Sequence, residues 1–270
     1  MAEIHEKPGT HEKAAINEKA AALRALHVPG DPVVLPNAWD AASARAVAAA
    51  GFPAVATGSA AVAAALGYED GQDTPVDEML AAVARISRVV SVPVTADVER
   101  GYGLDPALLV RRLAEAGAVG CNLEDSDPAT GSLLGAAEQA GFLAAVRAAA
   151  AEAGVDLVIN ARVDAFIHGY GSPEERLAEA VARGRRYLEA GADCVYPILA
   201  SDPEVIRALV REIGGPVNVY FQPGMPAVRD LAALGVARIS FGPGLHSAAQ
   251  EFTARMLGAI ARGDDPFPSG

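Results

Sequence analysis

A short pattern recurs four times along this chain of 270 residues: a helix-forming segment ends at a glycine, and an apolar run follows directly. Glycine suits this position because the residue after a helix often adopts a left-handed conformation, which is strained for residues that carry a side chain. Each copy therefore predicts a helix that leads into a buried strand. The copies lie at 49–52, 115–118, 189–192 and 233–236.

Apolar runs and helix starts extend this pattern over the whole chain. Eight alternating units favour an α/β fold of the closed (β/α)₈ TIM-barrel type, for which about 250 residues are typical, although an open doubly wound sheet uses the same local pattern. Four helices are predicted to begin where a capping side chain precedes a proline: Thr74-Pro75, Asp105-Pro106, Ser172-Pro173 and Asp202-Pro203. The eight apolar runs predict buried parallel strands near 33–35, 54–57, 92–97, 119–124, 157–162, 194–198, 217–220 and 238–241.

The chain is predicted to form one barrel domain over residues 1–270, because no linker-like segment divides it. Residues 10–27 are rich in Ala, Glu, Lys and Leu and predict an extra helix within an N-terminal extension, residues 1–28. Near the other end, four apolar side chains share one face of a predicted helix: Phe252, Met256, Leu257 and Ile260. This face either closes the protein's own barrel or packs against another subunit.

Composition excludes several classes of partner. The net charge of −12 argues against nucleic acid, because binding phosphate backbones needs clustered Lys and Arg. No run approaches the roughly 20 apolar residues of a membrane span, and the charged first residues do not resemble a signal peptide. We therefore expect no membrane association and a cytoplasmic location. Cys121 and Cys194 lie within apolar runs and are expected to be buried thiols rather than a disulfide or a metal pair.

Charged residues gather where three predicted strands end. Active sites of such barrels form at the carboxyl ends of the strands, and there Asp97 and Glu99, then Glu124, then Arg162 follow successive apolar runs. Asp97 and Glu99 would share one face of an extended strand. Converging carboxylates repel one another unless a cation lies between them, and Mg²⁺ or Mn²⁺ suits oxygen ligands. The alternative is that these acids cap the next helix or face solvent.

Two further strand ends could hold an anion. Arg162 could bind a carboxylate through two hydrogen bonds or stabilise enolate charge, or it could form a structural ion pair with Asp97, Glu124 or Asp164. The small residues at 57–59 form a predicted turn whose backbone N–H groups and hydroxyls could surround an anion.

Over nearly its whole length the sequence resembles the isocitrate lyase and phosphoenolpyruvate mutase superfamily. The resemblance rests on the order and spacing of six segments, at 36–40, 57–59, 67–70, 96–103, 123–125 and 161–166. It implies a barrel whose last helix is exchanged between subunits, and a homo-oligomer that is a dimer or a homotetramer.

The resemblance also implies roles for individual residues. Mg²⁺, or alternatively Mn²⁺, would be held by Asp97, Glu99 and Glu124, some of them through water. Asp70, Glu124 and Arg162 are expected to act in catalysis. The residues expected to bind substrate are Trp39, Thr57, Gly58, Ser59, Asp97, Arg162 and, as a looser match, Asn218.

One segment departs from the family. Isocitrate and methylisocitrate lyases carry a mobile loop with a Lys-Lys-Cys-Gly-His core after the matching acids, and the mutases and phosphonopyruvate hydrolases have a loop with Lys and Asn. The corresponding loop here, which we expect to gate the site, spans residues 126–136 and has none of these groups. Its hydroxyls, as in Ser126, cannot replace a thiol without an activating base.

These observations predict a Mg²⁺-dependent lyase or decarboxylase that is not an authentic isocitrate lyase. It would cleave a carbon–carbon bond next to the keto or hydroxy carbon of a small α-keto or 2-hydroxy (di)carboxylic acid, through an enolate. One alternative is phosphorus–carbon chemistry on phosphoenolpyruvate or phosphonopyruvate. Another is a barrel that binds an α-keto acid without turnover.

Overall fold

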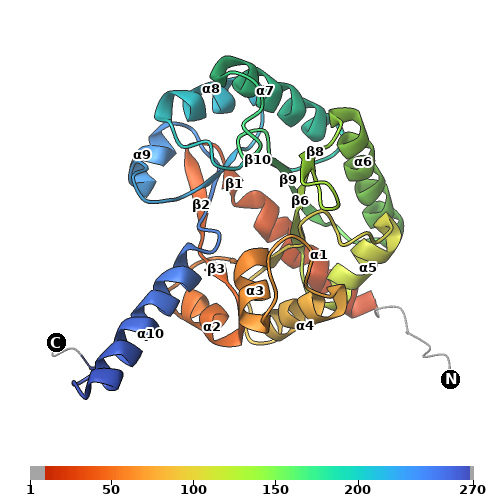
Figure 1. The fold of residues 1–270 in the computed structure, drawn as a ribbon. Helices are drawn as coiled ribbons and strands as arrows, with labels where there is room; N and C mark the ends of the chain where they lie inside the picture. The colour runs from red at the N-terminus through yellow and green to blue at the C-terminus, as the bar shows by residue number, and fades with distance from the viewer. Residues whose placement is uncertain (1–9, 268–270) are drawn as a thin grey trace.

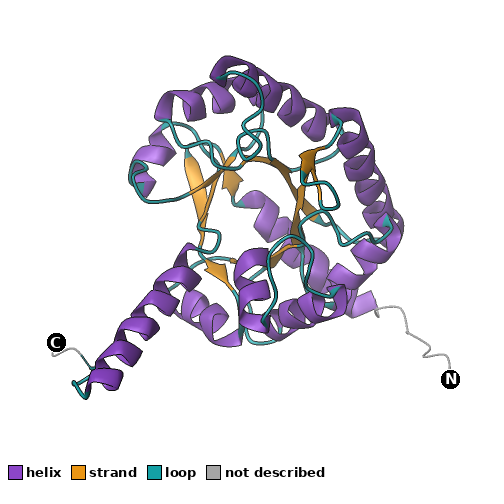
Figure 2. Ribbon diagram, in the orientation of Figure 1, coloured by secondary structure: helices purple, strands orange, loops and turns teal. Residues whose placement is uncertain are grey.

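The strands form a ring and the helices surround it, as the computed structural model of residues 10–267 shows (Figures 1 and 2). One parallel sheet has the order β10-β9-β6-β5-β4-β3, and β2 pairs with β12, which pairs with β11. A bridge between Val195 and Val217 joins β10 to β11. Pro36 separates β2 from β3, which together make one stave, so the ring is a closed eight-stranded barrel.

The barrel strands lie where the eight apolar runs predicted them. Their bounds are β2 (Asp31–Leu35), β3 (Asn37–Ala38), β4 (Val55–Thr57), β5 (Val94–Asp97), β6 (Gly120–Glu124), β9 (Val158–Val163), β10 (Cys194–Pro197), β11 (Asn218–Tyr220) and β12 (Arg238–Ser240). A short β1 (His27–Val28) pairs antiparallel with β2. The predicted fold class is confirmed.

Helices follow the strands around the outside of the barrel. They are α2 (Ala41–Ala49), α3 (Ser59–Leu66), α4 (Val76–Ser87), α5 (Pro106–Glu115), α6 (Ala136–Ala153), α7 (Pro173–Glu189), α8 (Pro203–Ile213), α9 (Val228–Ala233) and α10 (Gly244–Arg262). Three of the four predicted capping pairs begin helices, with Asp105, Ser172 and Asp202 accepting backbone hydrogen bonds. At the fourth, α4 begins after Pro75, without a side-chain cap.

The extra helix α1 (Thr10–Ala25) packs against the amino ends of the strands. Leu23 is fully buried there and lies in the space that Gly120 leaves, since a β-carbon on Gly120 would approach the Leu23 side chain to 2.9 Å. Arg24 forms ion pairs with Asp156 at 2.5 Å and Asp193 at 2.7 Å. This end of the barrel is therefore closed, which leaves the other end for the site. Residues 1–9 of the predicted extension lie outside the described residues.

The C-terminal helix α10 extends away from the barrel (Figure 1). Its apolar residues Phe252, Leu257 and Ile260 are exposed, at 45%, 59% and 55%. This face does not close the protein's own barrel, so the first of the two alternatives for it is wrong. Exchange of α10 between subunits, and with it the dimer or tetramer, stays a prediction. Across residues 10–267, none of the helices is both long and apolar enough to cross a membrane.

Candidate active site

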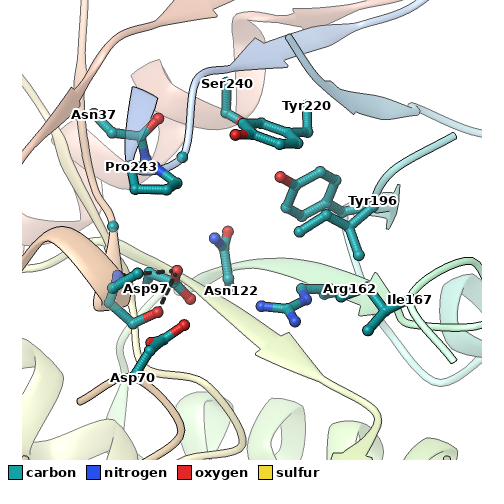
Figure 3. A pocket seen from close by; sticks show the side chains of 15 residues that line it. Asn37, Asp70, Asp97, Asn122, Arg162, Ile167, Tyr196, Tyr220, Ser240 and Pro243 are labelled. Carbon is teal, nitrogen blue, oxygen red and sulfur yellow. Dashed lines mark hydrogen bonds between the residues drawn. The ribbon is translucent and has the colours of Figure 1, made fainter. Parts of the chain in front are cut away.

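A pocket opens at the carboxyl ends of the strands, and all eight staves contribute to it (Figure 3). Side chains that end or directly follow the strands line it, together with residues of the loops above them. The lining residues are Asn37, Gly58, Ser59, Ala60, Asp70, Asp97, Asn122, Arg162, Ile167, Tyr196, Ile198, Tyr220, Ser240, Gly242 and Pro243.

Asp97, the last residue of β5, is held by the turn that follows β4. Its backbone N–H donates to the Thr57 hydroxyl at 2.9 Å. Its Oδ2 accepts hydrogen bonds from the Ser59 backbone N–H at 3.2 Å and the Ser59 hydroxyl at 3.0 Å. In this arrangement the turn binds a carboxylate of the protein itself. Gly58 and Ser59 line the pocket, whereas Thr57 lies behind them, 1% exposed.

Glu99 does not share a strand face with Asp97, because β5 ends at Asp97 and Glu99 has a left-handed backbone, with φ of 49°. The prediction that Asp97 and Glu99 share one strand face is therefore wrong, although the predicted strand near 92–97 ends where β5 ends. The side chain is 3% exposed, and its Oε1 accepts a hydrogen bond from the Tyr102 hydroxyl at 2.7 Å. Burial raises the pKa of Glu99 to about 7, although the bond from Tyr102 opposes this shift.

Asp70 lies at the rim of the pocket, on the loop after α3. The residue is exposed as a whole, but its carboxylate points into the pocket beside Asp97 (Figure 3). Burial of this carboxylate and the nearby charge of Asp97 raise its pKa. Asp70, Asp97 and Glu99 thus form one electrostatically coupled group of acids.

Arg162 joins two further acids. Its Nη1 lies 2.6 Å from Glu124, and its Nε lies 2.6 Å from Asp164, whose other oxygen is 3.1 Å from Nη2. Burial works to lower the pKa of Arg162, but Asp164 and Glu124 outweigh it and raise the pKa. Burial raises the pKa of Glu124, although Arg162 opposes it. The predicted structural ion pair is present, and Arg162 also lines the pocket.

Asp97, Glu99 and Glu124 were predicted to bind Mg²⁺. Their arrangement indicates whether they would bind the ion directly or partly through water. Among residues 13–267, whose side chains the structure describes, no three His, Cys, Asp or Glu lie close enough together to hold a metal ion directly. The Oδ1 of Asp97 is nevertheless buried without a hydrogen-bond partner among those residues. An unpartnered carboxylate oxygen beside other acids fits Mg²⁺, which usually keeps several waters and binds through one or two carboxylates.

Two predicted substrate residues lie elsewhere. Trp39 does not line the pocket and packs edge-on against His246 of α10, with ring centroids 5.1 Å apart. Asn218 is fully buried and exchanges hydrogen bonds of 3.3 Å with Ser240. Ser240 reaches the pocket instead.

Sequence reasoning missed Asn122, which forms the floor of the pocket. Its Oδ1 accepts hydrogen bonds from Asn160 Nδ2 at 2.9 Å and from Arg238 Nη2 at 3.3 Å. The signal was available, because Asn122 lies two residues before Glu124 on β6 and side chains two apart share a strand face. The tyrosines of the pocket, Tyr196 and Tyr220, were also missed.

The predicted gating loop contains a hairpin of β7 (Ser126–Asp127) and β8 (Ser132–Leu133). The Ser126 hydroxyl donates to Oδ2 of Asp164 and lies 2.8 Å from His168 Nε2. Since Asp164 accepts the hydroxyl proton, Nε2 of His168 is the donor in this geometry. The proton acceptor of the Ser126 hydroxyl is thus Asp164, 38 positions away, and His168, 42 positions away, donates to the same hydroxyl oxygen.

The sequence is similar to known proteins over most of its length. A profile of the phosphoenolpyruvate phosphomutase family matches residues 23–261. An uncharacterized protein of Mycobacterium tuberculosis is 34% identical over 239 residues, which cover 88% of each chain. The 2-methylisocitrate lyase of Aeropyrum pernix is 32% identical over 200 residues, 72% of this chain and 63% of that protein.

Solved structures share the fold as well. A crystal structure from Burkholderia cenocepacia J2315, provisionally named a phosphonomutase, has a TM-score of 0.86 and 45% identity, and the match covers 90% of this chain and 100% of that one. A phosphonopyruvate hydrolase in complex with oxalate and Mg²⁺ has a TM-score of 0.77 and 26% identity, with 91% and 88% covered. Sequence and fold therefore agree on one group of relatives.

Proposed function

Because the chain belongs to the phosphoenolpyruvate phosphomutase family, we propose that it is a Mg²⁺-dependent enzyme that cleaves a carbon–carbon bond next to the keto or hydroxy carbon of a small α-keto or 2-hydroxy acid. The matches of this chain include a phosphomutase family and a 2-methylisocitrate lyase. The observation that carries the proposal is the buried, unpartnered Oδ1 of Asp97 within a group of acids that faces Arg162 across one pocket.

Besides burial, the charge of Asp97 raises the pKa of Asp70 and of Glu99, and a bound Mg²⁺ would relieve this repulsion. Glu124, paired with Arg162, lies near them and would complete the set of acids around the ion. When bound, Mg²⁺ supplies Lewis-acid chemistry that stabilises the enolate formed as the adjacent bond breaks. The similar phosphonopyruvate hydrolase was solved with oxalate and Mg²⁺, which supports this choice of ion.

The protein's own residues then orient the substrate. Arg162 is fixed by two carboxylates and presents its guanidinium to the pocket, where it can face an anionic oxygen. The floor amide of Asn122 is fixed through its oxygen, which leaves its N–H₂ group as a donor toward the pocket. A substrate held between fixed donors reacts faster because less freedom is lost on reaching the transition state.

Proton transfer is the step for which this chain differs from isocitrate lyases. The hydrogen-bonded series Arg162, Asp164, Ser126 and His168 runs from the pocket to a half-buried histidine. We propose that Ser126 of the loop, with Asp164 as its proton acceptor and His168 as a donor to its oxygen, takes the place of the loop cysteine of the isocitrate and methylisocitrate lyases. General acid–base catalysis of this kind typically contributes about 10²- to 10⁴-fold in rate.

Assays with metal-stripped protein test the proposal. We expect no turnover after chelation, recovery with Mg²⁺ or Mn²⁺, and slow or absent cleavage of isocitrate and methylisocitrate compared with a smaller α-keto acid. Full activity in metal-free protein, or isocitrate turnover at ordinary lyase rates, would contradict it.

A second candidate is phosphorus–carbon chemistry, favoured by the provisional name of the 45% identical structure. Phosphonopyruvate in the same panel of assays decides between the two reactions, since its cleavage or rearrangement is followed by phosphate release or by ³¹P NMR. Mg²⁺-dependent binding of keto acids without turnover of any of them would indicate a binding protein instead.

A further inference from the structure

We infer that the substrate is an α-keto acid with one carboxylate whose distal end is apolar. This inference rests on the proposed function, because it concerns the same pocket. Two sides of the pocket differ in character (Figure 3). Asp70 and Asp97 stand on one side, and Tyr196, Tyr220 and Ile167 stand on the other.

The supply of positive charge limits how many carboxylates the pocket can hold. Arg162 is the only Lys or Arg among the described residues that line it. Its Nη1 is bound to Glu124, and its Nε and Nη2 are bound to Asp164. A second substrate carboxylate would therefore meet an arginine whose charge two buried acids already offset. Burying a carboxylate without a free cation is strongly unfavourable.

The next nearest cation does not reach the pocket. Arg238 comes from β12, which stands opposite β6 in the eight-membered ring of strands, and its side chain crosses the barrel to Asn122. The residue is 1% exposed and lies beneath the Asn122 floor. Its charge therefore favours an anionic group on the floor, where the substrate's own keto-acid end would lie. The charge of Arg238 does not stabilise a carboxylate at the opposite wall.

The opposite wall suits an apolar group. Ile167 lies there beside the rings of Tyr196 and Tyr220, whose uncharged hydroxyls point into the pocket (Figure 3). Ile167 is 41% exposed, so a ligand in the pocket would cover apolar surface that now faces water. Burial raises the pKa of Tyr196, so its hydroxyl stays neutral and can donate to an uncharged oxygen. A wall of this kind accepts an alkyl or aryl substituent better than a charged one.

Two keto acids of equal size test the inference. In 5-methyl-2-oxohexanoate an isopropyl group replaces the distal carboxylate of 2-oxoglutarate. We expect calorimetry with saturating Mg²⁺ to show at least tenfold tighter binding of 5-methyl-2-oxohexanoate, and pH-matched buffer controls correct for heats of ionisation. Equal or tighter binding of 2-oxoglutarate overturns the assigned substrate class while leaving the proposed function intact. Failure of both acids to bind in a Mg²⁺-dependent manner overturns the proposed function and this inference together.

A variant adds a second, independent readout. Ile167→Arg places a free cation on the apolar wall at an exposed position, so folding should be little affected. We expect it to shift the ratio of the two affinities at least tenfold toward 2-oxoglutarate. The matched control is Val28→Arg, at a residue that is 45% exposed near the amino ends of the strands, and it should leave the ratio unchanged. An unchanged ratio in Ile167→Arg would show that this wall does not contact the distal group, against the inference.

Discussion

Replacing Arg238 by methionine is predicted to stabilise the protein while weakening its hold on an anionic substrate. The guanidinium is buried inside the barrel and donates one hydrogen bond, to Asn122 Oδ1 at 3.3 Å. Its Nε and Nη1 have no hydrogen-bond partner among residues 10–267. Burial lowers the pKa of Arg238, which is the direction expected for a charge with little compensation.

The expected change in the free energy of unfolding has three contributions. Burying a charged group costs several kcal/mol even after the surroundings relax. One hydrogen bond to a neutral acceptor returns about 1 kcal/mol. Methionine keeps an unbranched apolar side chain of slightly shorter reach, so the remaining cavity should cost about 1 kcal/mol. We therefore expect Arg238→Met to gain about 1–3 kcal/mol of stability.

Urea unfolding measures this gain as a higher midpoint at an unchanged slope. The control Arg238→Lys keeps the buried charge and should show no gain. Calorimetry with Mg²⁺ and a keto acid should show weaker binding by roughly five- to tenfold in Arg238→Met, because Asn122 loses a fixed partner and the floor loses its positive charge. A loss of more than about 1 kcal/mol of stability would refute the reasoning, because the guanidinium would then have partners in solution that offset its burial.

Three further predictions concern single side chains. Asp97→Ala should abolish Mg²⁺-dependent turnover but change the melting temperature little, because removing one of several repelling acids relieves strain in the metal-free fold. Burial lowers the pKa of His27 to about 4, whereas the unfolded chain has a pKa of about 6.5. Stability should therefore be complete above pH 6.5 and fall by up to about 3 kcal/mol as the pH drops toward 4, and His27→Gln should lose less in urea unfolding at each pH. Ser126→Ala and His168→Asn should each lower the turnover number more than tenfold with little change in KM, while Ser126→Thr restores part of it; unchanged turnover in both would remove these residues from catalysis.

The barrel could be predicted from sequence because its signals are local. Each glycine that ends a helix and each apolar run lies within a few residues of the element it predicts. Gly117 and Gly191, for example, both have positive φ, 77° and 99°, three residues before β6 and β10 begin. The same locality explains the error at Glu99. The shared face assumed an extended backbone beyond Asp97, but the chain turns after Val98, and Gly101 and Gly103, both with positive φ, are the residue types that indicate this turn.

Only part of the site could be predicted from the sequence. Its other residues are distant in sequence and come together only in the folded protein. Glu124 is the last residue of β6 and Arg162 the next-to-last residue of β9, so both could be identified from the ends of the apolar runs. His168 could not, because its role depends on a hydroxyl 42 residues away. Arg238 was missed for a different reason: a lone arginine in an apolar run is ordinarily exposed or paired, and only the closed ring places β12 opposite Asn122 of β6.

The buried arginine links the stability of this barrel to its substrate. The fold gains little from Arg238, since most of its donors lack partners, and evolution readily supplies apolar residues at such positions. A buried charge with so few partners beneath a pocket floor favours a negative group bound above it. Asn122 connects Arg238 to the bound ligand. Arg238 and Asn160 both donate hydrogen bonds to its oxygen, which leaves its N–H₂ group free to bind a ligand. Since Glu124 and Asp164 offset the charge of Arg162, a negative charge added on this floor would gain electrostatic energy from Arg238 without Mg²⁺. It follows that residual keto-acid binding in metal-free protein should depend on Arg238 and should disappear in Arg238→Met, whereas Arg238→Lys should retain part of it.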